Sequence, residues 1–129
     1  MSASETSEQI ALVRVLRRSL IRFCAVPNGG WRNRVEANRL RTAGVEPGVP
    51  DLLIFDPPPC AEVCPCCKRP LVVGLGLEMK RADGVPSDVS QAQQDWLEAL
   101  DVRGWATAVG YGAVGTLHKL KALGYSLKG

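Results

Sequence analysis

The sequence lacks any apolar run that approaches the roughly 18 residues of a membrane-spanning helix. Its start also lacks the basic and apolar regions of a signal peptide. We therefore expect an intracellular, cytoplasmic protein that has no membrane partner and keeps its thiols reduced. Histidine is nearly absent as well. His118, on a predicted terminal helix, is the only one, and that position is more typical of a surface residue than of a catalyst.

Acidic residues are scarce in the first third of the chain. From residue 14 to residue 41 a single acid, Glu36, accompanies eight arginines, at positions 14, 17, 18, 22, 32, 34, 39 and 41. Arginine suits bidentate contact with phosphate, so the basic segment indicates a polyanionic partner. Arg14 and Arg18 recur at helical spacing on one face. The alternative is a basic helix face that is simply solvated.

The composition favours one domain over residues 1–129, with 46% hydrophobic and 22% charged residues. The patterns predict helices over about 7–20, 33–43, 90–104 and 113–123, and strands over about 23–26, 48–55, 71–80 and 105–109. This order predicts an α/β (α+β) sandwich. Ser7 is the expected N-cap of the first helix. Cys24, alone on an apolar segment, is expected in the core.

Charged residues occupy one end of each of two apolar strands, 48–55 and 71–80. Asp51 opens the first strand, while Glu78 and Lys80 close the second on one face. If the strands pair as an antiparallel hairpin, Asp51 lies beside Glu78 and Lys80. Two carboxylates with a backbone carbonyl suit a hard cation such as Mg²⁺. The alternative is a hairpin whose charged ends sit in solvent.

Four cysteines crowd the expected hairpin tip, a Cys-rich insertion at about 57–70. They are Cys60, Cys64, Cys66 and Cys67. The two-residue gap of Cys64-Pro-x-Cys67 lets both thiolates reach one Zn²⁺. We expect one structural zinc, with Cys60 and Cys66 completing the ligands, although two adjacent cysteines strain a tetrahedral site. The first alternative is a cluster of free thiols. A disulfide comes last, because a cytosolic protein keeps its thiols reduced. No histidine lies nearby to indicate catalytic zinc.

Several motifs occur together in one order over about residues 5–111. They are Asn28-Gly29-Gly30, the run from Gly44 to Leu52 that contains Pro50-Asp51, Leu77-Glu78-Met79-Lys80-Arg81, and Ser90-x-x-Gln93-x-x-Trp96 followed by Leu100 and Gly104. Pro-Asp followed by Glu-x-Lys resembles the active-site signature of the PD-(D/E)xK nuclease superfamily. The full set resembles its virus-type replication-repair nuclease (VRR-NUC) branch. That resemblance implies a restriction-endonuclease-like core with a mixed central sheet flanked by helices.

The resemblance also implies a set of site residues. Asp51, Glu78 and the Met79 carbonyl would hold one or two Mg²⁺ or Mn²⁺ ions, which polarise a phosphate and activate water. Lys80 would position or deprotonate that water and stabilise charge. Gln93 and Glu8, or Glu5 in its place, would orient waters on the metal. For Gln93 a capping box with Ser90 is the structural alternative, and for Glu8 it is the dipole of its own helix.

The implied substrate is DNA. Its phosphate backbone would be contacted by arginines that include Arg14, Arg18, Arg32 and Arg34. Stand-alone members of the branch resemble junction resolvases. We therefore expect a homodimeric endonuclease acting on branched DNA or Holliday junctions, in repair, recombination or phage replication. A DNA-binding module without hydrolysis and a restriction-like endonuclease are the alternatives. The chain offers little room for the recognition domain that the latter would need.

Overall fold

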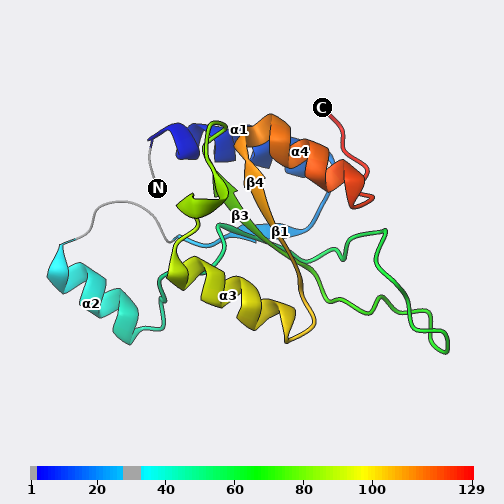
Figure 1. Cartoon of the computed structure of the whole chain (residues 1–129), viewed down its shortest axis with the longest axis horizontal. Helices are drawn as coiled ribbons and strands as arrows, with labels where there is room; N and C mark the ends of the chain where they lie inside the picture. The colour runs from blue at the N-terminus through cyan, green and yellow to red at the C-terminus, as the bar shows by residue number, and fades with distance from the viewer. Residues whose placement is uncertain (1–2, 28–32) are drawn as a thin grey trace.

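A four-stranded mixed sheet organises the fold (Figure 1). The computed structural model describes residues 3–27 and 33–129. The elements are α1 (Ala3–Arg18), β1 (Phe23–Ala25), α2 (Arg34–Thr42), β2 (Leu52–Ile54), β3 (Leu75–Lys80), a 3₁₀ helix (Pro86–Asp88), α3 (Gln91–Asp101), β4 (Ala106–Tyr111) and α4 (Gly112–Ala122). Within the described ranges, no helix is long and apolar enough to cross a membrane. The predicted order of helices and strands is confirmed.

The strands lie in the order β1-β2-β3-β4. β2 pairs antiparallel with both β1 and β3, whereas β4 joins β3 in parallel, so the expectation of a mixed sheet is confirmed. Leu52 lies opposite Leu77 in the β2–β3 register. One step outward along that register, Asp51 comes beside Glu78. The antiparallel hairpin predicted from the two apolar runs is therefore present.

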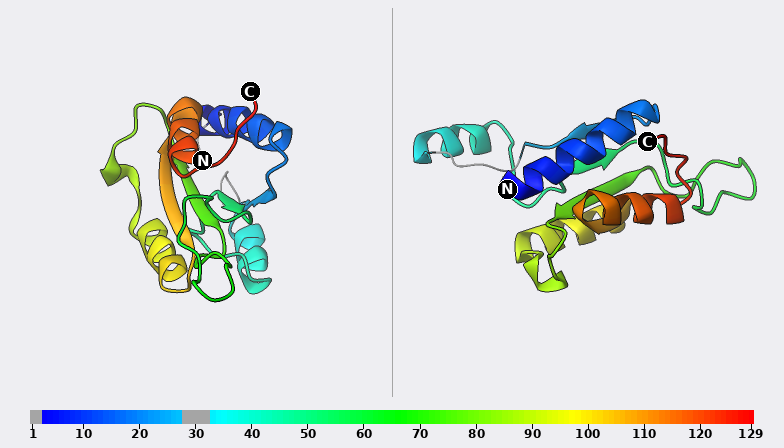
Figure 2. Two further views of the ribbon diagram at one scale, coloured as in Figure 1. Left: turned by 90° about the vertical axis from the view of Figure 1, so that its right-hand side faces the viewer. Right: turned by 90° about the horizontal axis from the view of Figure 1, so that it is seen from above.

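The two faces of β3 meet different helices, because successive side chains of a strand point to opposite sides. Leu75, Leu77 and Met79 are buried in the core, together with residues of α1 and α4 such as Leu12 and Leu120. Figures 1 and 2 show α1 and α4 side by side on one face of the sheet and α3 on the other. The intervening residues of β3 therefore face α3.

Gly76 lets α3 lie close to the sheet. A Cβ atom built at this position would come within 2.7 Å of Leu100 Cδ1, which projects from α3. The helix can approach β3 because this position has no side chain. Leu100 lies in the last turn of α3, so this contact holds that end of the helix against the start of β3. The first turn of α3 meets the charged end of β3 through the bond from Lys80 to Gln93.

Three details of the sequence interpretation were wrong. α1 begins at Ala3, so Ser7 lies inside the helix instead of capping it; Glu5 stands in the first turn, where the helix dipole favours a carboxylate. β3 begins only at Leu75, because the residues before it belong to the long connection from β2. Cys24 is exposed and not in the core, since β1 is the edge strand of the sheet.

Two segments extend from the body at opposite ends (Figure 1). α2 stands off at the end where α3 begins, and none of its residues is buried. The connection between β2 and β3, residues 55–74, projects at the other end. We call this connection the finger. It contains the four clustered cysteines, and a β-bridge between Val63 and Pro70 closes it.

Candidate functional site

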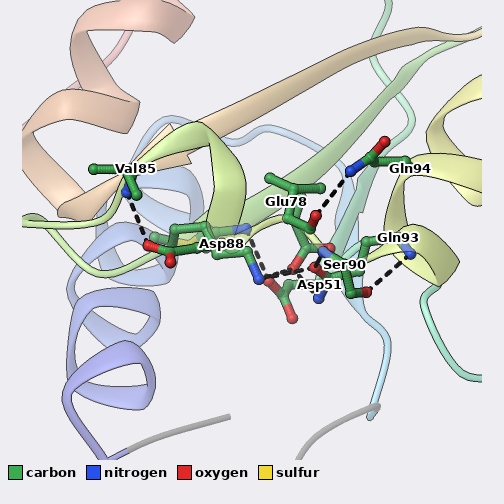
Figure 3. A network of polar contacts seen from close by, with 10 residues as sticks. Asp51, Glu78, Val85, Asp88, Ser90, Gln93 and Gln94 are labelled. Atoms are coloured by element: carbon green, nitrogen blue, oxygen red, sulfur yellow. Dashed lines mark hydrogen bonds and ion pairs between the residues drawn. The ribbon is translucent and has the colours of Figure 1, made fainter.

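A buried pair of carboxyl groups lies where β2 begins and β3 ends. Asp51 is 7% exposed and Glu78 is 2% exposed. The Asp51 carboxylate accepts a hydrogen bond from the backbone N–H of Met79, with 2.8 Å between Oδ2 and N. This bond fixes the acid against β3 and turns it toward Glu78. Figure 3 shows the two side chains close together, beside the start of α3. The juxtaposition predicted from the strand pattern is confirmed.

Glu78 carries a strongly perturbed carboxyl group. Burial, followed by the charge of Asp51, raises the pKa of Glu78 to about 9, against an opposing effect of Lys80. As a carboxylate, Glu78 has one buried oxygen, Oε2, without a hydrogen-bond partner among the described residues; with a proton, the group hydrogen-bonds to Asp51, which also raises its pKa. A buried carboxylate oxygen without a partner is costly. The site therefore favours either a proton on Glu78 or a cation beside it.

Gln93 connects the acidic pair to a lysine. Its Oε1 atom accepts from Lys80 Nζ at 2.8 Å, and its Nε2 atom donates to Glu78 Oε1 at 3.1 Å. The same Oε1 atom accepts from the backbone N–H of Ser90, while Ser90 Oγ accepts from the backbone N–H of Gln93. Gln93 therefore closes the capping box of α3 and also faces the site (Figure 3). The two interpretations of this residue are compatible.

Lys80 is held at the same point. Its Nζ atom lies 3.9 Å from Glu78 Oε1, and the residue is 8% exposed. Lys80 also lines a pocket of about 440 Å³, together with Glu5, Arg81, Asp83, Gly84 and Asp88. The pocket connects Lys80 with solvent, and its lining carries three acids as well as two basic residues.

Glu8 and Glu5, the two candidates from α1, occupy different surroundings. The Glu8 carboxylate accepts a hydrogen bond from the backbone N–H of Ala113, in the first turn of α4. Glu5 lines the pocket beside Lys80, and its charge contributes to the raised pKa of Glu78. The geometry therefore favours Glu5 as the acid that α1 offers to the site, and it gives Glu8 a helix-capping contact.

The sequence interpretation overlooked the pocket residues that follow β3. Arg81 pairs with Asp83, and Asp88 accepts from the backbone N–H of Val85 at the start of the 3₁₀ helix. Asp88 sits three residues after Val85 and just behind Pro86, a spacing typical of a capped turn. From the sequence, this spacing could have indicated the capped turn. Nothing local indicated that this turn would border Lys80.

The basic residues predicted to contact DNA are distributed over two helices. Arg14 and Arg18 are exposed on α1, and Arg34 is exposed at the start of α2. Asn33 caps α2 through the N–H of Glu36, and Glu36 pairs with Arg39. Arg32, like the motif at residues 28–30, falls outside the described residues.

The cysteines of the finger are not gathered into a metal centre. Cys60, Cys66 and Cys67 are exposed, and Cys64 is half-buried. Among residues 3–27 and 33–129, no three His, Cys, Asp or Glu side chains are arranged to hold a metal ion. Backbone N–H groups of Cys67 and then Cys66 donate to the Cys64 sulfur and hold the pKa of that thiol below its ordinary value. Zinc binding by this segment stays a prediction.

Comparison with known proteins is informative at the level of the fold. No known family model matches the chain, and no curated protein does. A solved structure described as a VRR_NUC domain protein superposes with a TM-score of 0.65 at 19% identity, covering 95% of this chain and 89% of that one. The chain therefore has the fold of a VRR-NUC domain, as the sequence motifs predicted.

Proposed function

We propose that this chain is a divalent-metal-dependent DNA endonuclease that hydrolyses phosphodiester bonds. One observation carries the proposal: a buried pair of carboxyl groups, Asp51 and Glu78, lies beside the ammonium group of Lys80 and contains an oxygen that has no partner in the described part of the chain. A module that only binds DNA gains nothing from acids facing phosphates. The VRR_NUC likeness of the fold supports the same class of chemistry.

The donor set fits a hard cation. Asp51 and Glu78 offer carboxylate oxygens at one end of the hairpin, and Met79, between Glu78 and Lys80, would offer its carbonyl as a third ligand. Mg²⁺ takes one or two protein carboxylates and otherwise keeps water or phosphate ligands, so two acids are sufficient. When bound, Mg²⁺ or Mn²⁺ would polarise the scissile phosphate and lower the pKa of an attacking water.

The protein groups around the acids have separate tasks. Lys80 is fixed by the Gln93 carbonyl oxygen, so its ammonium group can hold a phosphate oxygen and the attacking water in place. A donor that is positioned in advance stabilises the negative charge that develops in the transition state. The Gln93 amide keeps Glu78 aligned from the other side. Glu5, on the wall of the same pocket, would orient water; Glu8 remains the alternative.

The proposal also covers how the DNA is bound and which DNA structure is cut. Exposed arginines on α1 and α2, among them Arg14, Arg18 and Arg34, support a grip on the phosphate backbone. α2 stands beside the site end of the molecule (Figure 1), where it could follow a strand that leaves the cleavage point. Stand-alone members of the branch that the sequence motifs resemble are similar to junction resolvases. That resemblance supports branched DNA as the substrate of a homodimer, with a role in repair, recombination or phage replication.

A cleavage panel tests the proposal. Linear duplex, flap and four-way-junction DNA are incubated with the purified protein and Mg²⁺ or Mn²⁺, with a chelator control. We expect metal-dependent cutting, with branched substrates preferred. Cutting of every substrate at equal rates would remove the structure selectivity. No cutting of any substrate with either metal would remove the nuclease assignment.

Variants tie the cutting to the site. Asp51→Asn, Glu78→Gln and Lys80→Ala should each abolish cleavage while leaving DNA binding largely intact, because each removes a metal ligand or the cation beside it. Asp101→Asn and Lys121→Ala are matched controls, since both residues are exposed at the ends of α3 and α4. Residual cleavage near the wild-type rate in one site variant would exclude that residue from the mechanism.

A further inference from the structure

The tip of the finger is folded as a tight turn around one cysteine. The Lys68 N–H donates to the Cys64 carbonyl at 2.9 Å, and the Cys64 N–H donates to the Arg69 carbonyl at 2.8 Å. Lys68 has a φ of 64°, a conformation uncommon for a residue with a side chain. The N–H groups of Cys66 and Cys67 point at the Cys64 sulfur. Hydrogen bonds to the sulfur fix its orientation within the turn.

Cys64 and Cys67 are therefore a preformed pair of soft ligands. The Cys64 thiol is within hydrogen-bonding contact of the thiols of both Cys67 and Cys66. Of these two, Cys67 has the two-residue spacing with which two thiolates bind one Zn²⁺. Thiolates select zinc over the hard cations that carboxylates prefer. The tip could thus take a metal that differs from the one proposed for Asp51 and Glu78.

The chain does not supply the other two ligands at this point. Cys60 is held at the base of the finger, where its N–H donates to the Leu123 carbonyl after α4, and the Val63–Pro70 bridge lies between it and the tip. Cys66 is adjacent to Cys67 in the same turn, so both cannot join Cys64 on one tetrahedral ion without strain. The described residues contain no arrangement of three ligands for a metal ion. A structural zinc site needs four.

The surface of the finger indicates where the missing ligands come from. Val63, Leu71 and Val73 are 47%, 55% and 56% exposed along its two arms. The finger projects from the body (Figure 1), so its tip is accessible to a second molecule. A second finger would cover these apolar side chains and place its own turn against the first.

We propose that Cys64 and Cys67 form one half of a tetrathiolate zinc site, which the same two cysteines of a second copy of this chain complete. Four thiolates around Zn²⁺ leave a net charge of minus two. Lys68 and Arg69 follow directly in each copy and offset that charge. In this arrangement the expected zinc ion joins the two chains of the expected homodimer, so that two chains share one metal ion in place of one metal ion per chain.

Zinc content and molar mass, measured together without DNA, test this assembly. The full chain is purified under a non-thiol reductant with a slight excess of zinc, desalted, and examined by elemental analysis and light scattering. We expect about one zinc for two chains, as four thiolates per ion require, and a mass that halves when a strong chelator is added. One zinc per chain, no zinc, or a mass that the chelator leaves unchanged would overturn the proposal.

Cysteine variants separate the half-site from the alternatives. Cys64→Ser and Cys67→Ser should each lose the zinc and the zinc-dependent mass, whereas Cys66→Ser and Cys60→Ser should keep both. Equal loss in all four variants would assign the metal to a site within one chain. Circular dichroism checks that each variant is folded.

A variant without any change of thiols tests the apolar contact. Leu71→Ser should weaken dimerisation at least about tenfold, because it removes most of one leucine side chain per copy from the expected interface. The variant should still bind zinc through Cys64 and Cys67 at high protein concentration. Unchanged dimerisation would show that the arms of the finger do not pack together. None of these results depends on nuclease activity, so they stand or fall separately from the proposed function.

Discussion

Replacing Glu78 by Gln is expected to remove most of the pH dependence of folding near neutrality in the metal-free protein. The reason is the pKa of Glu78, which burial and then the charge of Asp51 raise from 4.5 to about 9. Between these two values the folded protein holds a proton on Glu78 that the unfolded chain has released. The stabilisation is complete below the lower value and is lost as the pH rises toward the upper one.

The magnitude follows from one proton. A difference of one bound proton changes the free energy of unfolding by about 1.4 kcal/mol per pH unit. From pH 5 to pH 8 the wild-type protein should therefore lose on the order of 4 kcal/mol more stability than the Glu78→Gln variant loses.

Denaturant unfolding in the presence of a chelator, at four pH values between 5 and 8, measures this difference. Glu98→Gln is the matched control, because Glu98 is exposed on α3. Adding Mg²⁺ should stabilise the wild type increasingly as the pH rises, since the cation takes the place of the proton, and should do much less for Glu78→Gln. A gap between wild type and variant that stays constant from pH 5 to pH 8 would refute the reasoning.

Replacing Arg14 and Arg18 together should weaken DNA binding regardless of sequence and flatten its salt dependence by about one unit of slope per lost phosphate contact. Anisotropy titrations at several salt concentrations measure this, and an unchanged slope would leave the pair as solvated surface. Ser90→Ala should lower stability by about 1 kcal/mol with cleavage intact, whereas Gln93→Ala should also slow cleavage about 10- to 100-fold. Equal cleavage by the two variants would show that Gln93 acts only as a helix cap. Glu8→Gln should lower thermal stability and leave cleavage unchanged. Lost cleavage at unchanged stability would instead indicate that Glu8 takes part in the metal site.

The sequence was sufficient to place Asp51, Glu78 and Lys80 together, because strand geometry is regular. Two apolar runs with charges at opposite ends admit one antiparallel register that buries both, and this register brings the charges together. The Ser90–Gln93 cap is also local, since its partners are three residues apart. In both cases the information lies within a short stretch or follows from a fixed repeat.

Other features depended on contacts that the sequence does not show. The bond from the Ala113 N–H to Glu8 joins residues 105 positions apart, so no local pattern could have separated the role of Glu8 from that of Glu5. Cys24 is exposed because of where its strand lies in the sheet. The same short apolar strand would be buried at the centre of a sheet.

The hairpin carries its chemistry at one end and its connecting segment at the other, which makes the connection free to diverge during evolution. Ile54 and Leu75 pair directly where the finger begins and ends, so the length of chain between them leaves the register of Asp51 and Glu78 unchanged. Doubling such a loop adds only about 0.6 kcal/mol of closure entropy. Insertions could thus accumulate there under weak selection and acquire new partners while cleavage persisted.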